Sequence, residues 1–229
     1  MTGFCSKALP KYAELVQQRQ RKETLRRVYI VPNEKVIKQY IVNHSRWPFY
    51  AKPWLREEKA MVRAKATHRV PKHIDTIVER INTTTLCVTQ IKTFVEGEPL
   101  TIADQLDVIA VAELLAELHS VKVITNDCQK ENMLRNNTNK LQCIDLGRAS
   151  TYRYRSLMYY RAIGSEMARL FRRVLDSNEC LMQVFLKRYF QIIGFSRWQK
   201  SLVLFFYHLS HSARLKRRIK KTKERSNNK

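Results

Sequence analysis

Apolar residues gather in short runs in the first part of the chain and recur at helical spacing in the second part. Residues 24–31 and 35–42 are rich in β-branched and aromatic residues and are separated by Pro32-Asn33-Glu34, which predicts a β-hairpin. Residues 86–95 predict a further strand region. Helical spacing predicts helices at residues 54–66, 102–119, 158–175, 179–193 and 198–215. Strands followed mainly by helices indicate an α+β fold.

The two ends of the chain are polar and basic. Residues 17–23, in a basic N-terminal segment of residues 1–23, predict a solvated helix to which we assign no chemistry. In the C-terminal tail, residues 214–229, the stretch 214–225 holds eight lysine or arginine residues against one glutamate. Such a cluster either attracts anionic lipid head groups or only keeps the chain in solution, and both interpretations stand. The amphipathic segment 198–211 leads directly into the tail, so the two together fit a membrane surface.

Charge and cysteine content narrow the setting in which the protein works. The 229 residues carry a formal net charge of +23, which implies an anionic partner: nucleic acid, a phospholipid surface or a phosphate-rich glycolipid. The five cysteines are odd in number and form no C-x-x-C pair, which favours a reducing compartment and disfavours zinc. The N-terminus lacks the apolar region of a signal peptide, and the longest apolar run, residues 202–207, is too short to span a membrane. We therefore expect a cytoplasmic location.

Residues 124–149 contain the clearest chemical pattern in the chain. Apolar runs at residues 121–125 and 141–146 bracket a polar loop that carries Asp127 and, five residues later, Asn132. The second run ends in Asp145-Leu146-Gly147. Phosphoryl transfer needs an acceptor hydroxyl held in line and metal ions that bridge the phosphate oxygens. Asp127 would orient and deprotonate the hydroxyl, while Asn132 and Asp145 supply the oxygen ligands that Mg²⁺ prefers.

This arrangement resembles the H-R-D-x-x-x-x-N and D-F-G segments of protein kinases. It is more similar to small bacterial kinase-like proteins, and among these to the lipopolysaccharide core kinases that act on Kdo or heptose. The resemblance covers residues 24 to 175. It implies a compact two-lobe protein-kinase-like fold, with a β-rich N-lobe at residues 24–99 and a reduced helical C-lobe at residues 100–213. It also implies a kinase that uses ATP and Mg²⁺ to phosphorylate a sugar hydroxyl of the lipopolysaccharide core.

The same resemblance suggests how the nucleotide would be held. Lys38, in the second predicted strand, resembles the strand lysine that contacts the α- and β-phosphates. The helix at residues 54–66 would bring a glutamate to Lys38, and we favour Glu58 over Glu57 because Met61 and Val62 lie on the adjoining face. The adenine would bond backbone groups around residues 90–92. Since no glycine lies between residues 3 and 97, a glycine-rich phosphate cover is absent, and we expect Arg26, Arg27 or Lys35 to contact the phosphates.

The segment also departs from the family pattern. Thr125 stands where these families place a histidine, and Asn126 where they place arginine or glycine. An inactive kinase-like fold therefore remains an alternative. We expect His119 to be a structural hydrogen-bonding residue and Cys128 to pack inside the loop.

Several kinds of partner and function are compatible with the pattern. The resemblance implies an anionic glycolipid acceptor and a peripheral position at the inner face of the cytoplasmic membrane. A protein kinase or another small-molecule kinase of the same fold is the first alternative. The second is a non-catalytic module that binds membrane or RNA, although the chain has no RNA-binding signature, so nucleic acid is not the expected partner.

Overall fold

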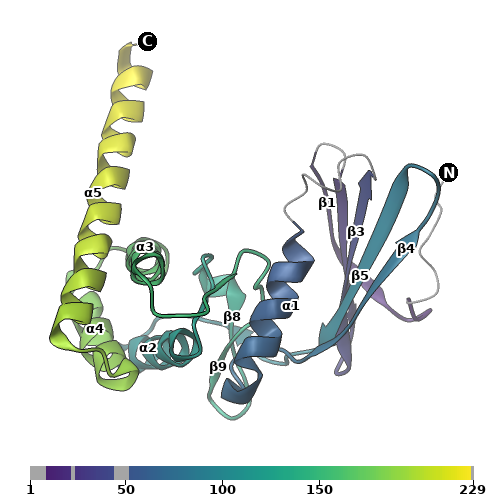
Figure 1. The fold of residues 1–229 in the computed structure, drawn as a ribbon, viewed down its shortest axis with the longest axis horizontal. Helices are drawn as coiled ribbons and strands as arrows, with labels where there is room; N and C mark the ends of the chain where they lie inside the picture. The colour runs from purple at the N-terminus through teal and green to yellow at the C-terminus, as the bar shows by residue number, and fades with distance from the viewer. Residues whose placement is uncertain (1–8, 22–23, 44–51, 228–229) are drawn as a thin grey trace.

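The computed structural model describes residues 9–21, 24–43 and 52–227. The first half of the chain forms a five-stranded antiparallel sheet in the order β1-β2-β3-β5-β4. Its strands are β1 (Glu14–Arg21), β2 (Thr24–Val31), β3 (Lys35–Asn43), β4 (His73–Arg80) and β5 (Thr85–Thr93). Helix α1 (Pro53–Ala64) lies between β3 and β4 in the chain and packs beside the sheet (Figure 1). We call residues 9–93 the sheet half.

The register of the central strands places alternate side chains on two faces of the sheet. Lys38 lies opposite Val28 of β2 and Gln90 of β5, so residues of equal parity share one face. On the face toward α1, Tyr40 and its neighbours form a small core with Trp54 of the helix. The other face buries Tyr29, Val31 and Ile37. Both faces of the central strands therefore carry buried side chains.

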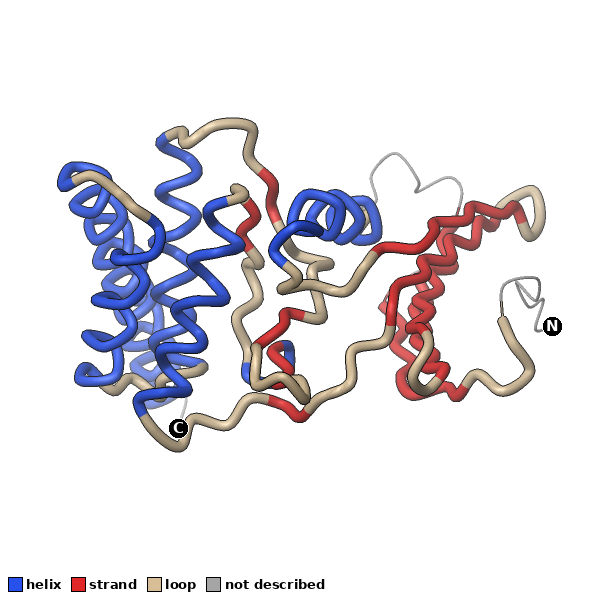
Figure 2. The backbone as a smooth tube through the Cα atoms, turned by 90° about the horizontal axis from the view of Figure 1, so that it is seen from below, coloured by secondary structure: helices blue, strands red, loops and turns tan. Residues whose placement is uncertain are grey.

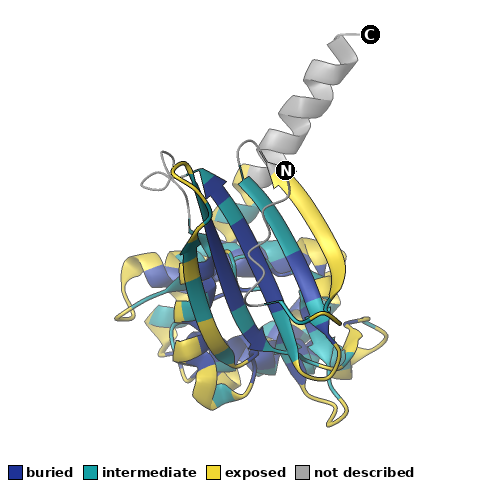
Figure 3. Cartoon of the chain, turned by 90° about the vertical axis from the view of Figure 1, so that its right-hand side faces the viewer, coloured by how far each residue is buried: buried dark blue, intermediate teal, exposed yellow. Residues whose placement is uncertain are grey.

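The predicted hairpin of residues 24–31 and 35–42 is confirmed, but the helix expected at residues 17–23 is wrong. Residues 14–21 form the edge strand β1, which pairs with β2 in the register Gln18 to Arg27. Figure 3 looks onto the sheet and shows β1 as its exposed edge. Pairing with β2 overrides the local helical preference, and the glutamines and arginines of β1 keep its open edge from pairing with other chains. Residues 22 and 23 lie outside the described residues, as does Cys5.

Four long helices form the other half of the molecule and enclose most of its apolar core. They are α2 (Gln105–Ser120), α3 (Leu157–Arg173), α4 (Glu179–Ile193) and α5 (Arg197–Asn227). Figure 2 shows these helices gathered at one end of the molecule and the sheet at the other. All four confirm predicted helices, and the mixed α+β class is confirmed with them. We call residues 98–227 the helical half; of the tail, only the helical backbone to Asn227 is described.

Short elements before and after α2 hold the segment that carries the chemical pattern. They are β6 (Glu98–Pro99), β7 (Val123–Ile124), the 3₁₀ turn η3 (Lys130–Asn132), β8 (Met133–Arg135), β9 (Leu141–Cys143) and β10 (Ser150–Thr151). Strands β8 and β9 form a hairpin to which β6 adds, while β7 pairs with β10. The polar loop at residues 125–132 is thus tied down at both ends by strand pairing.

Arg69 is one of the residues that join the two halves. Arg69 follows the 3₁₀ turn η2 (Lys65–Thr67), and its guanidinium donates to both oxygens of Glu117 on α2, at 2.8 and 2.6 Å. The same side chain donates to the carbonyl of Leu141, and the Arg69 carbonyl accepts from Cys143 N at 2.8 Å. The α1–β4 connection is therefore anchored to the helical half. Within the described ranges, no helix is both long enough and apolar enough to cross a membrane.

Candidate active site

Lys38 lies where the face of β3 meets α1, and it pairs with Glu57 rather than with the predicted Glu58. The Lys38 Nζ donates to both oxygens of Glu57 at 2.8 Å, and both side chains are buried. Glu58 lies on the next face of the helix and accepts a hydrogen bond from Thr76 of β4 at 3.1 Å. The prediction of Glu58 is therefore wrong by one residue.

The error has a physical cause in the helical phase. We counted Val62 with Met61 as part of the apolar face, but Val62 is 60% exposed. The buried face of α1 instead runs through Trp54, Glu57, Met61 and Ala64, which follows the three- and four-residue spacing of one helix face. A glutamate inside that apolar series is the signal that would have identified Glu57.

Glu57 has a second buried cation beside it, which the sequence analysis did not identify as part of the site. Lys92 of β5 donates to Glu57 Oε1 at 2.6 Å and also to the carbonyl of Ile144. Residues 90–92, where we expected the adenine to bond, thus lie in a strand paired on both sides, and their backbone groups belong to the sheet. The strand pairing contradicts that expectation.

Asp145 brings the helical half into the same cluster. Its Oδ1 accepts from Lys38 at 3.2 Å and from the backbone N–H of Gly147 at 3.1 Å. Arg26 of β2 approaches Oδ2 at 3.5 Å. Three cations from three neighbouring strands therefore surround two carboxylates, one from α1 and one from the segment after β9.

The cluster keeps its carboxylates ionised. Burial works against the charge of Glu57, but Lys38 and Lys92 outweigh it and hold the Glu57 pKa below its ordinary value. The pKa of Asp145 is likewise held low by Lys38, Lys92 and Arg26 despite its partial burial. Burial dominates for Lys92 and lowers its pKa to about 8, whereas for Lys38 the two carboxylates overcome burial and raise the pKa. Asp145 is thus anionic at neutral pH, as a metal ligand must be.

The loop that carries Asp127 is held by a buried carboxylate, Glu166. Glu166 of α3 accepts from the hydroxyl of Thr125 at 2.5 Å and from the backbone N–H of Asn126 at 2.6 Å. Its other oxygen lies 2.6 Å from Nε2 of His119, whose Nδ1 contacts the hydroxyl of Tyr189. These hydrogen bonds outweigh burial and lower the Glu166 pKa. His119 is structural, as predicted.

Asn126 adds a second set of contacts to this loop. Its backbone is left-handed, at φ 59°, a conformation that asparagine tolerates better than most residues. Its amide nitrogen donates to the carbonyl of Arg148 at 3.1 Å and to the hydroxyl of Ser150 at 2.9 Å. Thr125 and Asn126 therefore fix the loop from both sides, although neither carries an imidazole.

Asp127 and Asn132 meet across this loop. The amide nitrogen of Asn132 donates to the carbonyl of Asp127 at 3.2 Å, which leaves the amide oxygen of Asn132 to serve as a ligand. The backbone N–H of Ile144 donates to the carbonyl of Asn132, which brings Asn132 next to the segment that carries Asp145. The two predicted metal ligands thus lie just before β8 and just after β9, the two strands of one hairpin.

The side chain of Asp127 lies among cations. Its Oδ1 accepts from Gln129 at 2.6 Å and from Arg173, at the end of α3, at 3.2 Å. Arg148 lies 3.7 Å from Oδ2. Both arginines keep a large exposed fraction, 61% for the side chain of Arg148 and 40% for that of Arg173. The surroundings of Asp127 therefore favour a negatively charged ligand.

The residues present fit Mg²⁺ and a nucleotide phosphate. Asn132 and Asp145 supply one amide and one carboxylate oxygen, a typical protein share for Mg²⁺, which completes its shell with water and phosphate oxygens. In the described ranges no three His, Cys, Asp or Glu side chains converge as a self-sufficient metal site. Arg26 Nε is buried and has no hydrogen-bond partner among the residues that the structure describes, which suits a bound anion.

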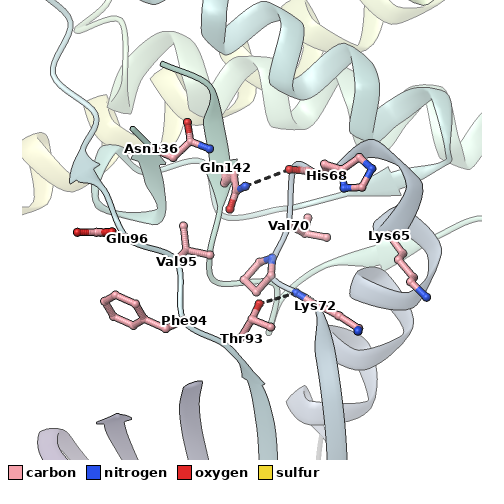
Figure 4. A pocket seen from close by; sticks show the side chains of 11 residues that line it. Lys65, His68, Val70, Lys72, Thr93, Phe94, Val95, Glu96, Asn136 and Gln142 are labelled. Atoms are coloured by element: carbon pink, nitrogen blue, oxygen red, sulfur yellow. Dashed lines mark hydrogen bonds between the residues drawn. The ribbon is translucent and has the colours of Figure 1, made fainter. Parts of the chain in front are cut away.

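A separate pocket of about 400 Å³ lies at the connection between the two halves (Figure 4). It is bounded by the α1–β4 connection, the segment after β5 and the β8–β9 hairpin, and its lining includes His68, Phe94 and Gln142. None of the candidate catalytic residues contributes to it.

Three of the described cysteines, Cys87, Cys128 and Cys143, are buried, and Cys180 is exposed. Cys128 packs as predicted: it is buried, and burial raises its thiol pKa well above the ordinary value. Burial raises the pKa of Cys143 to about 12.

No known protein family matches the chain, and no curated protein matches its sequence.

Proposed function

We propose that the protein is an ATP- and Mg²⁺-dependent kinase that phosphorylates a sugar hydroxyl of the lipopolysaccharide core. One observation carries the proposal: Lys38, Glu57 and Asp145 form a single ion-paired cluster across the two halves. In protein kinases the lysine of the third strand pairs with a helix glutamate, and both this pair and the metal-binding aspartate must be in place for catalysis. Lys38 lies on the third strand and pairs with the helix that follows it.

The strand cations would bind the phosphates. Lys38 lies between Glu57 and Asp145, where its ammonium group would be within reach of a phosphate oxygen of the nucleotide. Arg26 is the candidate that the structure favours in place of a glycine-rich cover, because it approaches Asp145 and carries the unpaired Nε. Asn132 and Asp145 would hold Mg²⁺, which would supply positive charge against the phosphates.

Asp127 would act as the general base. Its carboxylate accepts the proton of the acceptor hydroxyl while that oxygen forms its bond to the γ-phosphorus and the bond to the β-phosphate oxygen breaks, releasing ADP. Gln129 and Arg173 hold the carboxylate in place through Oδ1.

The cations around Asp127 support an anionic acceptor. Arg148 and Arg173 would face the substrate that delivers its hydroxyl to Asp127, and phosphate or carboxylate groups pair well with guanidinium. A core glycolipid carries such groups, and the net charge of +23 suits a peripheral position at the inner face of the cytoplasmic membrane.

The test is a phosphoryl-transfer assay with γ-labelled ATP and Mg²⁺. The acceptors are truncated core glycolipid and a generic basic protein. We expect label on the glycolipid, a loss of roughly 10²–10⁴ in rate for Asp127→Ala with ATP affinity unchanged, and no turnover for Asp145→Asn. Asp75→Asn is the matched control, because Asp75 is exposed on β4 and an asparagine there can still accept the hydrogen bond from the backbone N–H of Thr76.

Each outcome assigns the function differently. Label on the protein alone would make the chain a protein kinase. Label on neither acceptor, with no stabilisation by ATP and Mg²⁺, would support the non-catalytic alternative.

A further inference from the structure

Lys92 connects three parts of the candidate site. It lies on β5, on the same sheet face as Lys38, because Gln90 is opposite Lys38 and Lys92 is two residues further on. Its ammonium group is buried, donates to Glu57 Oε1 at 2.6 Å, and donates to the carbonyl of Ile144, the residue before Asp145. Lys92 thus joins β5, α1 and the metal-binding segment through one nitrogen.

The charge balance of the cluster explains why a second lysine is useful. Glu57 is fully buried and cannot be left without a cation, because a buried unpaired carboxylate is strongly unfavourable. Lys38 contacts both Glu57 oxygens, yet a phosphate would compete for the same ammonium group. If Lys38 were its one partner, Glu57 would keep the Lys38 ammonium group in the ion pair and away from the phosphate.

We propose that Lys92 is a positioning residue that keeps Glu57 neutralised and tied to the Asp145 segment, so that Lys38 can turn to the nucleotide phosphates. This role rests on the proposed function. It assigns no contact between Lys92 and the nucleotide: Lys92 acts through Glu57 and the backbone of Ile144.

The role predicts a pH signature. The titratable groups around Lys92 are Glu57 on α1, Lys38 on β3, Cys143 on β9 and Asp145. Both carboxylates have lowered pKa values, Lys38 has a raised one, and Cys143 titrates near 12, so none of these changes charge near neutral pH. Lys92 does change charge in this range, because its pKa is about 8. Above that pH it becomes neutral and no longer offsets Glu57, so Lys38 stays with Glu57 and ATP binding weakens.

The experiment measures Mg·ATP affinity of the full chain by calorimetry between roughly pH 7 and pH 9. A single group of pKa about 8 loses about nine-tenths of its protonated fraction over this range, so we expect an affinity loss of roughly tenfold in the unaltered protein. Lys92→Met should bind about tenfold more weakly at the lower pH and show little further dependence on pH. Lys140→Met, at an exposed lysine of the β8–β9 turn, is the matched control and should keep the full pH dependence.

The outcomes separate this role from the kinase assignment. If the unaltered protein binds ATP with no pH dependence, or if Lys92→Met keeps both its affinity and its slope, the role of Lys92 is refuted and the kinase proposal stands. If the unaltered protein binds no Mg·ATP, the kinase proposal itself fails and this role with it. If Lys92→Met does not fold, the pH dependence of the unaltered protein decides between these outcomes.

Discussion

Replacing Glu57 by glutamine should destabilise the protein far more than the same change at Glu58. Glu57→Gln keeps the shape of the side chain and removes its charge. Two buried lysines, Lys38 and Lys92, would then share Asp145 as their nearest remaining carboxylate. Glu58 is half-buried, and a glutamine there can still accept the hydrogen bond from Thr76. The two substitutions are chemically identical and one residue apart, so any difference reflects the cluster.

The magnitude follows from burial. Removing one partner of a buried ion pair typically costs about 3–5 kcal/mol, because the other charge is left without compensation. We expect a value of about 3 kcal/mol for Glu57→Gln, since Lys92 can lose its proton and so relieve part of the cost. A neutral hydrogen bond contributes about 1 kcal/mol, which sets the upper bound for Glu58→Gln.

The sign of the pH dependence can be stated in advance. The Glu57 pKa is lowered in the folded state from its ordinary value of 4.5, so its ionisation stabilises the fold at neutral pH. That contribution is complete above the unfolded-state pKa and is lost as the pH falls toward the folded-state value. The difference between the unaltered protein and Glu57→Gln should therefore shrink on acidification.

Urea unfolding followed by circular dichroism measures these free energies. A double-mutant cycle with Lys38→Met isolates the pair, and contacting charged residues usually couple by about 0.5–3 kcal/mol. If the losses from Glu57→Gln and Lys38→Met simply add, or if Glu58→Gln costs as much as Glu57→Gln, the pairing described above is incorrect.

Three further predictions address other parts of the molecule. Arg173→Ala should raise the KM for the glycolipid about tenfold through loss of a charge-assisted contact, with ATP affinity unchanged. An equal rise in KM for Arg172→Ala, at the exposed neighbouring position, would contradict this role of Arg173. Gly164→Ala should lower the melting temperature, because the new Cβ would lie 2.7 Å from Phe206 Cβ. This contact would push α3 away from α5 at a cost of about 1–3 kcal/mol. Arg161→Ala, at an exposed position of the same helix, should leave the melting temperature unchanged. Deleting residues 214–229 should weaken binding to anionic vesicles in a salt-dependent way, and equal binding would reduce the tail to a solubilising segment.

The spacing of apolar residues predicted helices and strands well where it matches the pattern of burial. The hairpin and the long helices follow directly from runs and spacings that the packed structure preserves. The edge strand β1 was missed because its polar side chains carry no strand pattern, and its conformation depends on pairing with β2. Tertiary context decided that segment.

The loop residues of the candidate site were predictable from the sequence, but the partners of Lys38 and Glu57 were less so. Asp127, Asn132 and Asp145 lie close together in sequence, so their spacing and its resemblance to the kinase segments brought them into one prediction. The choice between Glu57 and Glu58 needed the buried face of α1, which an exposed valine obscured. Lys92 depends on the register between β3 and β5, a long-range pairing that one sequence does not reveal.

The chain passes from the sheet half to the helical half once, through residues 94–97, yet the halves hold each other through many contacts that do not use this connection. Arg69 pairs with Glu117 and Leu141, Lys92 reaches Ile144, and Lys38 reaches Asp145. Opening the backbone within residues 94–97 would therefore leave two fragments with complementary charged surfaces. When the two fragments are expressed separately and mixed, they should reassemble. Because each fragment supplies part of the ion-paired cluster, recovery of the proposed ATP binding would show that they had done so.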